Sequence, residues 1–209
     1  MNRILCSAAL LLTMQSTSAA EMFNGRDFNG WELKTTPATA IEQVFTNQAG
    51  GVVASTGQPA GFLATTRSYA NYTLHVEWRW SDKPGNGGVL LHISDGPMDR
   101  VWPVSLQVQT KHGSAGDLLP MAGAGFAEPL TSAPGAEPRI KGKTAADSEL
   151  PAGQWNVADI VSRNGVVDVT VNGVVQNRVT GAKPAQGRIG FQLEGAPYEL
   201  RNIRLEELP

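Results

Sequence analysis

Residues 71–81 alternate polar and apolar side chains without interruption, and this period of two constrains the fold more than any other feature of the 209-residue chain. A strand with this pattern buries one face and leaves the other polar. Six further runs have strand character, and no stretch shows an apolar stripe of helical period. These runs are residues 87–94, 104–110, 166–171, 174–179, 188–194 and 198–205. Short strands separated by turn signals predict an all-β protein, an antiparallel sandwich or barrel.

The turns between these runs predict how some strands pair. Asn172 and Gly173 separate two of them, and this dipeptide tolerates the positive φ angles of a two-residue hairpin turn. We therefore expect residues 166–179 to form a β-hairpin. The last two runs are separated only by residues 195–197, and we expect them to pair with each other and close the fold.

The longest stretch without strand character is residues 111–149, which is rich in Gly, Ala and Pro. Loops of this length within compact domains are usually functional or mobile. The alternative is an insertion without a role, and the sequence leaves both interpretations open.

The N-terminus has the pattern of a secretory signal peptide over residues 1–20. Arg3 supplies a positive start, residues 4–14 are apolar, and small residues precede a predicted cleavage after Ala20. The alternative is a membrane anchor, but the apolar run is shorter than the roughly 20 residues that cross a bilayer as a helix.

The mature protein is then a single domain over residues 21–209. Its composition is that of a globular protein, with 41% hydrophobic residues. Cys6, the only cysteine, would leave with the signal, so the domain would be stable without a disulfide. A net charge of −2 gives no electrostatic reason to bind nucleic acid or an anionic membrane. We expect a periplasmic or secreted protein that is free of the membrane after cleavage.

Several classes of catalytic site lack their sequence signature. The chain has no nucleophile elbow, no phosphate-binding glycine loop and no dinucleotide fingerprint. Its histidines, His75, His92 and His112, have no metal-ligand spacing. The remaining candidates are polar pairs on three strands, two residues apart and opposite the apolar face. The pairs are Glu77 with Arg79, Gln107 with Gln109, and Gln192 with Glu194.

A sheet face that is lined by such pairs suits a sugar. Sugar hydroxyls need hydrogen-bond donors and acceptors, and the apolar faces of pyranose rings stack on aromatic side chains. The alternative is a solvated face, which antiparallel sheets often have.

Six segments resemble, in order, the motifs of the 3-keto-disaccharide hydrolase family. They include MFNGRDFNGWE at residues 22–32, VWPVSLQVQTKHGSAGD at residues 101–117 and GRIGFQLEGAPYELRNI at residues 187–203. The others lie at residues 72–80, 84–92 and 153–156, so the matches extend over nearly all of the mature chain. The resemblance implies a concanavalin A-like jelly roll, in which two antiparallel sheets stack.

The resemblance also implies action on 3-keto-glycosides, small sugars whose C3 hydroxyl has been oxidised by a separate sugar 3-dehydrogenase upstream. The ketone acidifies the hydrogen on C2. Removal of that proton gives an enolate, which expels the substituent on C1, and addition of water makes the net reaction a glycoside hydrolysis. Such a hydrolase or lyase needs a base, an acid for the leaving group and a positive or hydrogen-bonding group at the enolate.

We assign these roles as hypotheses. Glu77 or Glu194 is the base, and His92 is an alternative base or the acid. Arg79 or Arg201 stabilises the enolate. The side chains that we expect to hold the sugar are Asn86, Trp102, Gln107, Gln109 and Gln192.

Most of these assignments have a structural alternative. Glu77 would form a surface ion pair, as would Glu199 with Arg201. His92 would be a buried hydrogen-bonding residue. Asp117 would cap a turn, or else it would bind a divalent cation. No other cofactor is indicated.

One departure from the family pattern concerns Gln107, which stands where the family motif has Glu. Glutamine cannot act as a base. The Gln107 strand also lacks the two glutamates that laminarinase-type glucanases of this fold carry on one strand, so a retaining glucanase is disfavoured. The alternative to an enzyme is a non-catalytic, lectin-like carbohydrate-binding module.

Overall fold

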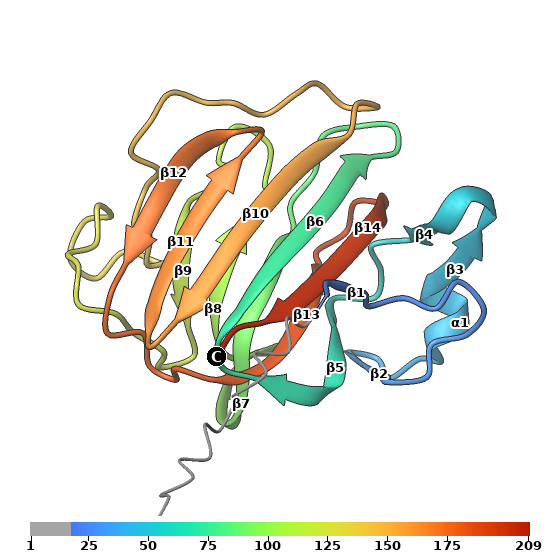
Figure 1. Cartoon of the computed structure of the whole chain (residues 1–209), viewed down its shortest axis with the longest axis horizontal. Coiled ribbons are helices and arrows are strands. Elements are labelled where there is room, and N and C mark those ends of the chain that lie inside the picture. Colours follow the sequence, from blue (N-terminus) through green and yellow to red (C-terminus); the bar gives the residue numbers. More distant parts are fainter. Residues whose placement is uncertain (1–17) are drawn as a thin grey trace, which may run out of the picture.

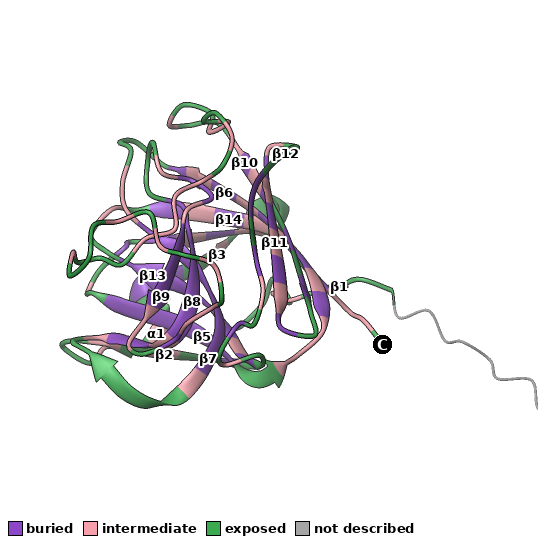
Figure 2. Cartoon of the chain, turned by 90° about the vertical axis from the view of Figure 1, so that its left-hand side faces the viewer, coloured by how far each residue is buried: buried purple, intermediate pink, exposed green. Residues whose placement is uncertain are grey.

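The computed structural model describes residues 18–209, which form two antiparallel sheets packed face to face (Figures 1 and 2). Eight strands make the larger sheet. They are β1 (Ala20–Glu21), β3 (Phe45–Gln48), β4 (Val52–Ser55), β6 (Tyr72–Trp80), β10 (Asn156–Arg163), β11 (Val166–Val171), β12 (Val174–Val179) and β14 (Tyr198–Glu207). Their spatial order is β12-β11-β10-β6-β14-β4-β3, with β1 also beside β14.

Six strands make the smaller sheet, in the order β2-β5-β13-β7-β8-β9. They are β2 (Trp31–Thr35), β5 (Gly61–Tyr69), β7 (Gly88–Asp99), β8 (Trp102–Gln109), β9 (Leu118–Met121) and β13 (Gly187–Leu193). Within the described part of the chain, the helical elements are one short α-helix, α1 (Ile41–Val44), and one 3-10 turn, η1 (Ala49–Gly51). The predicted all-β jelly-roll sandwich is confirmed.

The core fills the space between the two sheets, which Figure 2 shows as a buried layer. The alternation along β6 has the predicted effect, because all its apolar residues from Tyr72 to Trp80 are buried. They belong to the same cluster as apolar residues of the smaller sheet, such as Leu91, Leu106 and Phe191. Residues between them in sequence therefore point away from the core, toward the outer face of each sheet.

The hairpin prediction is confirmed. Strands β11 and β12 are antiparallel neighbours with the expected bounds. Asn172 and Gly173 between them have φ angles of 48° and 80°, as a turn of this kind requires.

The expected pairing of the last two runs is wrong. Strand β13 pairs with β5 and β7 in the smaller sheet, whereas β14 pairs with β6, β4 and β1 in the larger sheet. Residues 195–197 carry the chain from one layer to the other. A period of two predicts which face of a strand is buried, but it does not tell pairing within a sheet from stacking across the core.

The predicted signal peptide lies almost wholly outside the described residues. Ala20 is described, and it pairs with Leu205 of β14. Within residues 18–209, no helix is long and apolar enough to cross a bilayer.

Candidate functional site

A cavity of about 560 Å³ lies against the face of the smaller sheet that points away from the core. Its floor consists of polar side chains from β8 and β13. Its walls come from the β7–β8 hairpin, from the end of β9 with residues 122–123, and from residues 137–139. Strand β9 lies within residues 111–149, so the expectation that this stretch has no strand is wrong for residues 118–121. The alternation along β8 explains the floor, because Leu106 and Val108 point into the core and Gln107 and Gln109 point into the cavity.

The floor is a connected row of amides that ends in a carboxylate. Gln107 Nε2 donates to Gln109 Oε1 and to Gln192 Oε1, the second at 2.9 Å. Gln192 Nε2 in turn donates to Glu194 Oε2 at 2.8 Å. We call these four side chains the amide row. Its three glutamines are buried, so water does not compete for their hydrogen bonds.

Gly88 makes the amide row possible. It lies on β7, between β13 and β8, which carry the glutamines. A Cβ atom on Gly88 would lie 2.6 Å from both Cγ and Nε2 of Gln107. The missing side chain therefore provides the space in which Gln107 reaches across β7 to Gln192.

Two buried acceptors on residues that line the cavity have no hydrogen-bond partner among residues 18–209. They are Asn86 Oδ1 and Gln107 Oε1. An unsatisfied buried acceptor costs roughly 1–3 kcal/mol, and a ligand hydroxyl group would recover part of it where such a side chain turns toward the cavity. The floor is thus suited to a donor-rich ligand such as a sugar.

Glu194 is the carboxylate whose electrostatics fit a base at this site. It follows β13 directly, and solvent reaches it from the cavity side. Partial burial raises the pKa of Glu194 above its ordinary value, although the positive charges of Arg100 and Lys111 oppose the rise. Asp99, Glu137 and Arg139 line the same cavity.

The position of Glu194 depends on both sheets. The chain leaves the smaller sheet at this residue and enters the larger sheet at Tyr198. In the connection, Gly195 N donates to the carbonyl of Gly57 at 2.8 Å. A Cβ atom on Gly57 would lie 2.1 Å from the carbonyl oxygen of Ala196, so the two backbones are in close contact.

Comparison with known proteins identifies the family. The 3-keto-alpha-glucoside-1,2-lyase-like domain matches residues 18–206. The chain belongs to this family. The resemblance seen in the sequence motifs is therefore confirmed, and the chain is a jelly-roll protein of a carbohydrate-active family. A search of curated proteins found no match.

Solved structures share the fold of this lyase-like domain. A candidate glycosyl hydrolase from Parabacteroides distasonis ATCC 8503 has a TM-score of 0.66 at 19% identity, over 91% of this chain and 94% of that one. The endo-β-1,3(4)-glucanase SCLam of family GH16 has a TM-score of 0.59 at 11% identity, over 93% and 92%. The carbohydrate-binding module CBM66 from Bacillus subtilis has a TM-score of 0.56 at 10% identity, over 85% and 96%. These likenesses show the jelly-roll architecture.

The cavity of the lyase-like domain brings together six of the residues that the sequence singled out. Glu194 is one of the two proposed bases. The other five are all the side chains that we expected to hold a sugar, namely Asn86, Trp102, Gln107, Gln109 and Gln192.

Glu77, the other proposed base, lies on the outer face of the larger sheet and not at the cavity. There it forms an ion pair with Arg201 at 2.6 Å and accepts a hydrogen bond from Asn202 at 2.7 Å. Partial burial would raise the pKa of Glu77, but the hydrogen bonds from Asn202, Arg201 and His75 outweigh it and hold the pKa below its ordinary value. Glu77 is thus a stabilised anion, which is the opposite of the environment of Glu194.

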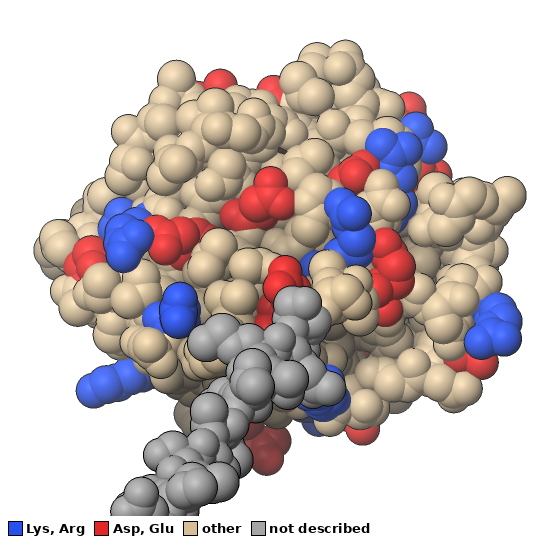
Figure 3. All heavy atoms as spheres, in the orientation of Figure 1, with Lys and Arg blue, Asp and Glu red and all other residues tan. Residues whose placement is uncertain are grey.

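Arg79 and Arg201 lie on the same outer face. Arg79 forms an ion pair with Glu199, and the two guanidinium carbons lie 4.6 and 4.1 Å from the ring centre of Trp155. Figure 3 shows acidic and basic side chains next to one another over β6 and β14. The family motif at residues 153–156 therefore supplies the ring of Trp155, which is covered by two arginines that each form an ion pair with a glutamate.

His92 is buried between the sheets, apart from the cavity. Its Nδ1 donates to the carbonyl oxygen of Pro184 at 2.9 Å, and its Nε2 lies 3.0 Å from Ser162 Oγ. Burial lowers the pKa of His92 to about 4, although the bond to Pro184 opposes this shift. These contacts match the structural alternative, a buried hydrogen-bonding residue.

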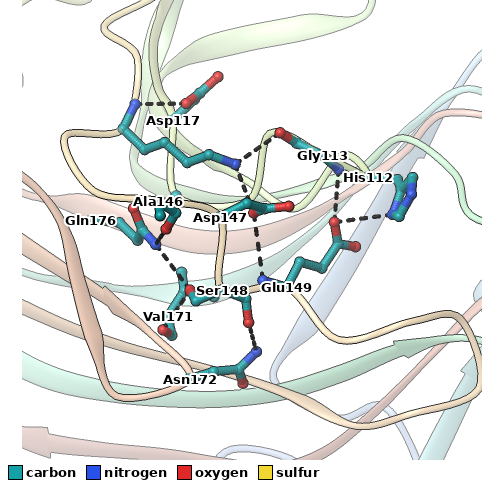
Figure 4. Close-up of polar contacts among 12 residues, drawn as sticks. His112, Gly113, Asp117, Ala146, Asp147, Ser148, Glu149, Val171, Asn172 and Gln176 are labelled. Atoms are coloured by element: carbon teal, nitrogen blue, oxygen red, sulfur yellow. Dashed lines mark hydrogen bonds and ion pairs between the residues drawn. The ribbon is translucent and has the colours of Figure 1, made fainter.

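Asp117 closes a loop. Its Oδ1 accepts a hydrogen bond from Lys143 N at 2.7 Å (Figure 4). Within the part of the chain that the structure describes, no group of three or more His, Cys, Asp or Glu side chains is arranged to hold a metal ion.

The sequence reasoning missed the cations of the cavity, Arg100, Lys111 and Arg139. They lie in a hairpin turn and in the long connection, where no periodic pattern indicates the direction of a side chain. Lys111 directly follows the Gln107–Gln109 strand in a matched family motif, and that position was the one available signal.

Proposed function

We propose that this protein cleaves 3-keto-glycosides, with Glu194 as the base that removes the proton from C2. The observation that carries the proposal is the convergence in one cavity of a carboxyl group with a raised pKa, two cations that act on it and two buried acceptors without partners. A base whose pKa lies closer to neutrality transfers protons more effectively at neutral pH.

The proposed step balances as an elimination. Glu194 takes the proton from C2, the electron pair forms the C1–C2 double bond, and the C1–O bond breaks. The departing oxygen takes up the proton that Glu194 has accepted. Addition of water to the double bond then completes a net hydrolysis.

The cations supply the enolate stabilisation that the sequence analysis assigned to Arg79 or Arg201. Arg100 and Lys111 both act electrostatically on Glu194, so they lie close enough to act on charge that develops beside it. Preorganised positive charge at a developing enolate is usually a large contribution to catalysis. Asn86 Oδ1 would accept a hydrogen bond from a sugar hydroxyl after a small rotation of its amide toward the cavity.

The test is an assay of turnover with a 3-keto-glucoside or 3-keto-trehalose as substrate. Enone absorbance and the release of free sugar measure the reaction. Glu194→Gln should lower kcat by at least about 100-fold, the contribution expected of a positioned base. Glu77→Gln tests the other carboxylate, and loss of turnover there but not in Glu194→Gln would overturn the assignment. A parallel assay with EDTA tests the divalent cation that the sequence left open.

The second candidate function is a non-catalytic carbohydrate-binding module. The amide floor favours it, because Gln107 replaces the family carboxylate and cannot act as a base. Calorimetric binding of several 3-keto-sugars without turnover of any would select this function.

The proposed substrate implies an upstream sugar 3-dehydrogenase that makes the ketone. We also propose that residues 1–20 direct export, as their sequence pattern indicates. An exported protein that begins at Glu21 in mass spectrometry would support this, and one that keeps residues 1–20 would contradict it.

A further inference from the structure

The amide row has a direction, to which the Glu194 carboxylate at one end and the Gln107 amide in the middle both contribute. A primary amide carries two N–H donors on nitrogen and an acceptor on oxygen. The Nε2 group of Gln107 donates to both neighbouring glutamines, so both present their oxygens to it. Gln192 therefore turns its own Nε2 the other way, toward Glu194 Oε2.

The surroundings keep this arrangement in place. Gln107 is 1% exposed, and Gln109 and Gln192 are also buried, so solvent cannot replace a lost partner. The Gln107 side chain lies directly over Gly88, because a Cβ atom there would be 2.6 Å from its Cγ and Nε2 atoms. If one amide were reversed, two oxygens or two N–H groups would face each other in a buried site. Each group left without a hydrogen bond would cost roughly 1–3 kcal/mol.

We propose that Gln107 is a positioning residue, which orients the amide row so that Gln192 holds one oxygen of Glu194 and leaves the other free to accept a proton. Glu194 Oε1 accepts no hydrogen bond from the described residues, whereas Oε2 accepts one. The relevance of this geometry to turnover rests on the proposed function. The direction of the hydrogen bonds can be tested whether or not that function is correct.

A glutamate at position 107 would reverse the row. A carboxylate only accepts hydrogen bonds, so the Nε2 groups of Gln109 and Gln192 would both turn toward it. Glu194 would lose its donor and would face a second negative charge, and both changes favour its protonated form. Arg100, Lys111, Asp99, Glu137 and Arg139, the other charged groups of the cavity, would stay as they are.

The first measurement uses the unmodified sequence. The side-chain ¹⁵N and ¹H shifts of Gln192 should follow the titration of Glu194 in an NMR pH series, because the two groups share a hydrogen bond. Glu194→Gln should remove that inflection. An unmodified protein in which the Gln192 amide does not respond to Glu194 would overturn the proposal, and this result needs no variant at position 107.

The second measurement compares two variants of equal charge. Gln107→Glu should make Glu194 bind its proton at least about tenfold more tightly and should uncouple Gln192 from it. Gln109→Glu adds the same charge on the same strand but keeps an acceptor for Gln107 Nε2, so the row keeps its direction. Its effect on proton binding by Glu194 should be less than about threefold. Equal effects of the two variants would show that charge alone acts and would overturn the proposal.

Turnover separates this proposal from the proposed function. Gln107→Glu should lower kcat at neutral pH and move the pH profile to higher pH, as expected for a base that protonates more readily. If Glu194→Gln keeps full activity while the Gln192 amide still follows Glu194, the proposed function fails and the positioning role of Gln107 stands.

Discussion

Gly88 contributes to the cavity through the side chain that it lacks. Gln107 occupies the space above it, and the nearest atoms to an added Cβ would belong to the flexible amide of that glutamine rather than to backbone. Gly88 does not have a positive φ angle, so alanine is compatible with its backbone. Substitution should therefore affect the amide row much more than the fold.

We predict that Gly88→Ala displaces the Gln107 amide and weakens sugar binding by about tenfold, equivalent to the loss of about one hydrogen bond. Stability should fall by about 1–3 kcal/mol, because the displaced amide leaves its buried partners without a hydrogen-bond donor. Calorimetric titration and chemical denaturation measure the two effects. Gly125→Ala is the control, since nothing lies within 4 Å of a Cβ atom there. Unchanged binding in Gly88→Ala would show that the row does not contact the ligand.

At the scale of elements, the long connection of residues 111–149 is anchored along its length. Figure 4 shows its two ends meeting, with Glu149 accepting hydrogen bonds from the Gly113 backbone at 2.7 Å and pairing with His112. Glu149 Oε1 also accepts a hydrogen bond from the buried Trp80 ring nitrogen at 3.2 Å. The connection supplies one wall of the cavity, so its anchoring also holds Lys111 in place.

We predict that Glu149→Ala destabilises the protein by about 1–3 kcal/mol, because Trp80 Nε1 and the Gly113 N–H lose their acceptor. Glu149→Gln should lose less stability than Glu149→Ala, since an amide oxygen still accepts one hydrogen bond. Denaturation measures the stability, and hydrogen exchange should increase at residues 111–113 in the alanine variant. If hydrogen exchange at residues 111–113 were the same in the alanine variant as in the unmodified protein, other contacts would be sufficient to hold this end of the connection.

For the whole molecule, His92 connects acid sensitivity to the packing of the two layers. It lies on β7 of the smaller sheet and contacts Ser162 on β10 of the larger one. The folded protein binds a proton on His92 only near pH 4, whereas an exposed histidine binds one near pH 6.5. Between these values the unfolded chain binds more protons than the folded chain, so stability is lost as pH falls.

We predict a loss of up to about 3 kcal/mol from His92 between about pH 6.5 and pH 4, from the difference between the two pKa values. His92→Asn should flatten that part of the stability curve. Asparagine tolerates the positive φ angle of 56° at this position, and its amide is suited to the bond with Pro184. Urea denaturation at several pH values measures the effect, and an unchanged slope in the variant would assign the acid sensitivity to other groups.

Much of the layering could be predicted from the sequence, because alternation directly encodes which side of a strand is buried. The same pattern placed Gln107 and Gln192 on a polar face, and the structure brings them together. Glu77 and Arg79 carry an identical pattern on the other sheet. Only the topology, which a period of two does not encode, distinguishes the outer face with the glutamine-floored cavity from the outer face with the Glu77 ion pair.

The rest of the site depends on contacts between segments that are far apart in the sequence. Arg100 lies in a turn and Arg139 lies in the long connection, so neither belongs to a periodic run. Glu194 was predicted as a candidate, but its raised pKa depends on its surroundings in the folded protein. The wrong pairing of the last two strands has the same origin, because a short connection can join neighbours in one sheet or cross between two.

That crossing has a mechanical consequence for the proposed base. Glu194 lies where the chain passes from one sheet to the other, and the close contact between Gly57 and Ala196 fixes the path that follows. A small slide of one layer over the other would move this carboxylate while leaving the glutamine floor where it is. Laboratory evolution of catalytic rate should therefore find gains at position 196, which does not line the cavity, as well as among the residues that line it. Position 57 should remain glycine, because any side chain there would meet the backbone of Ala196.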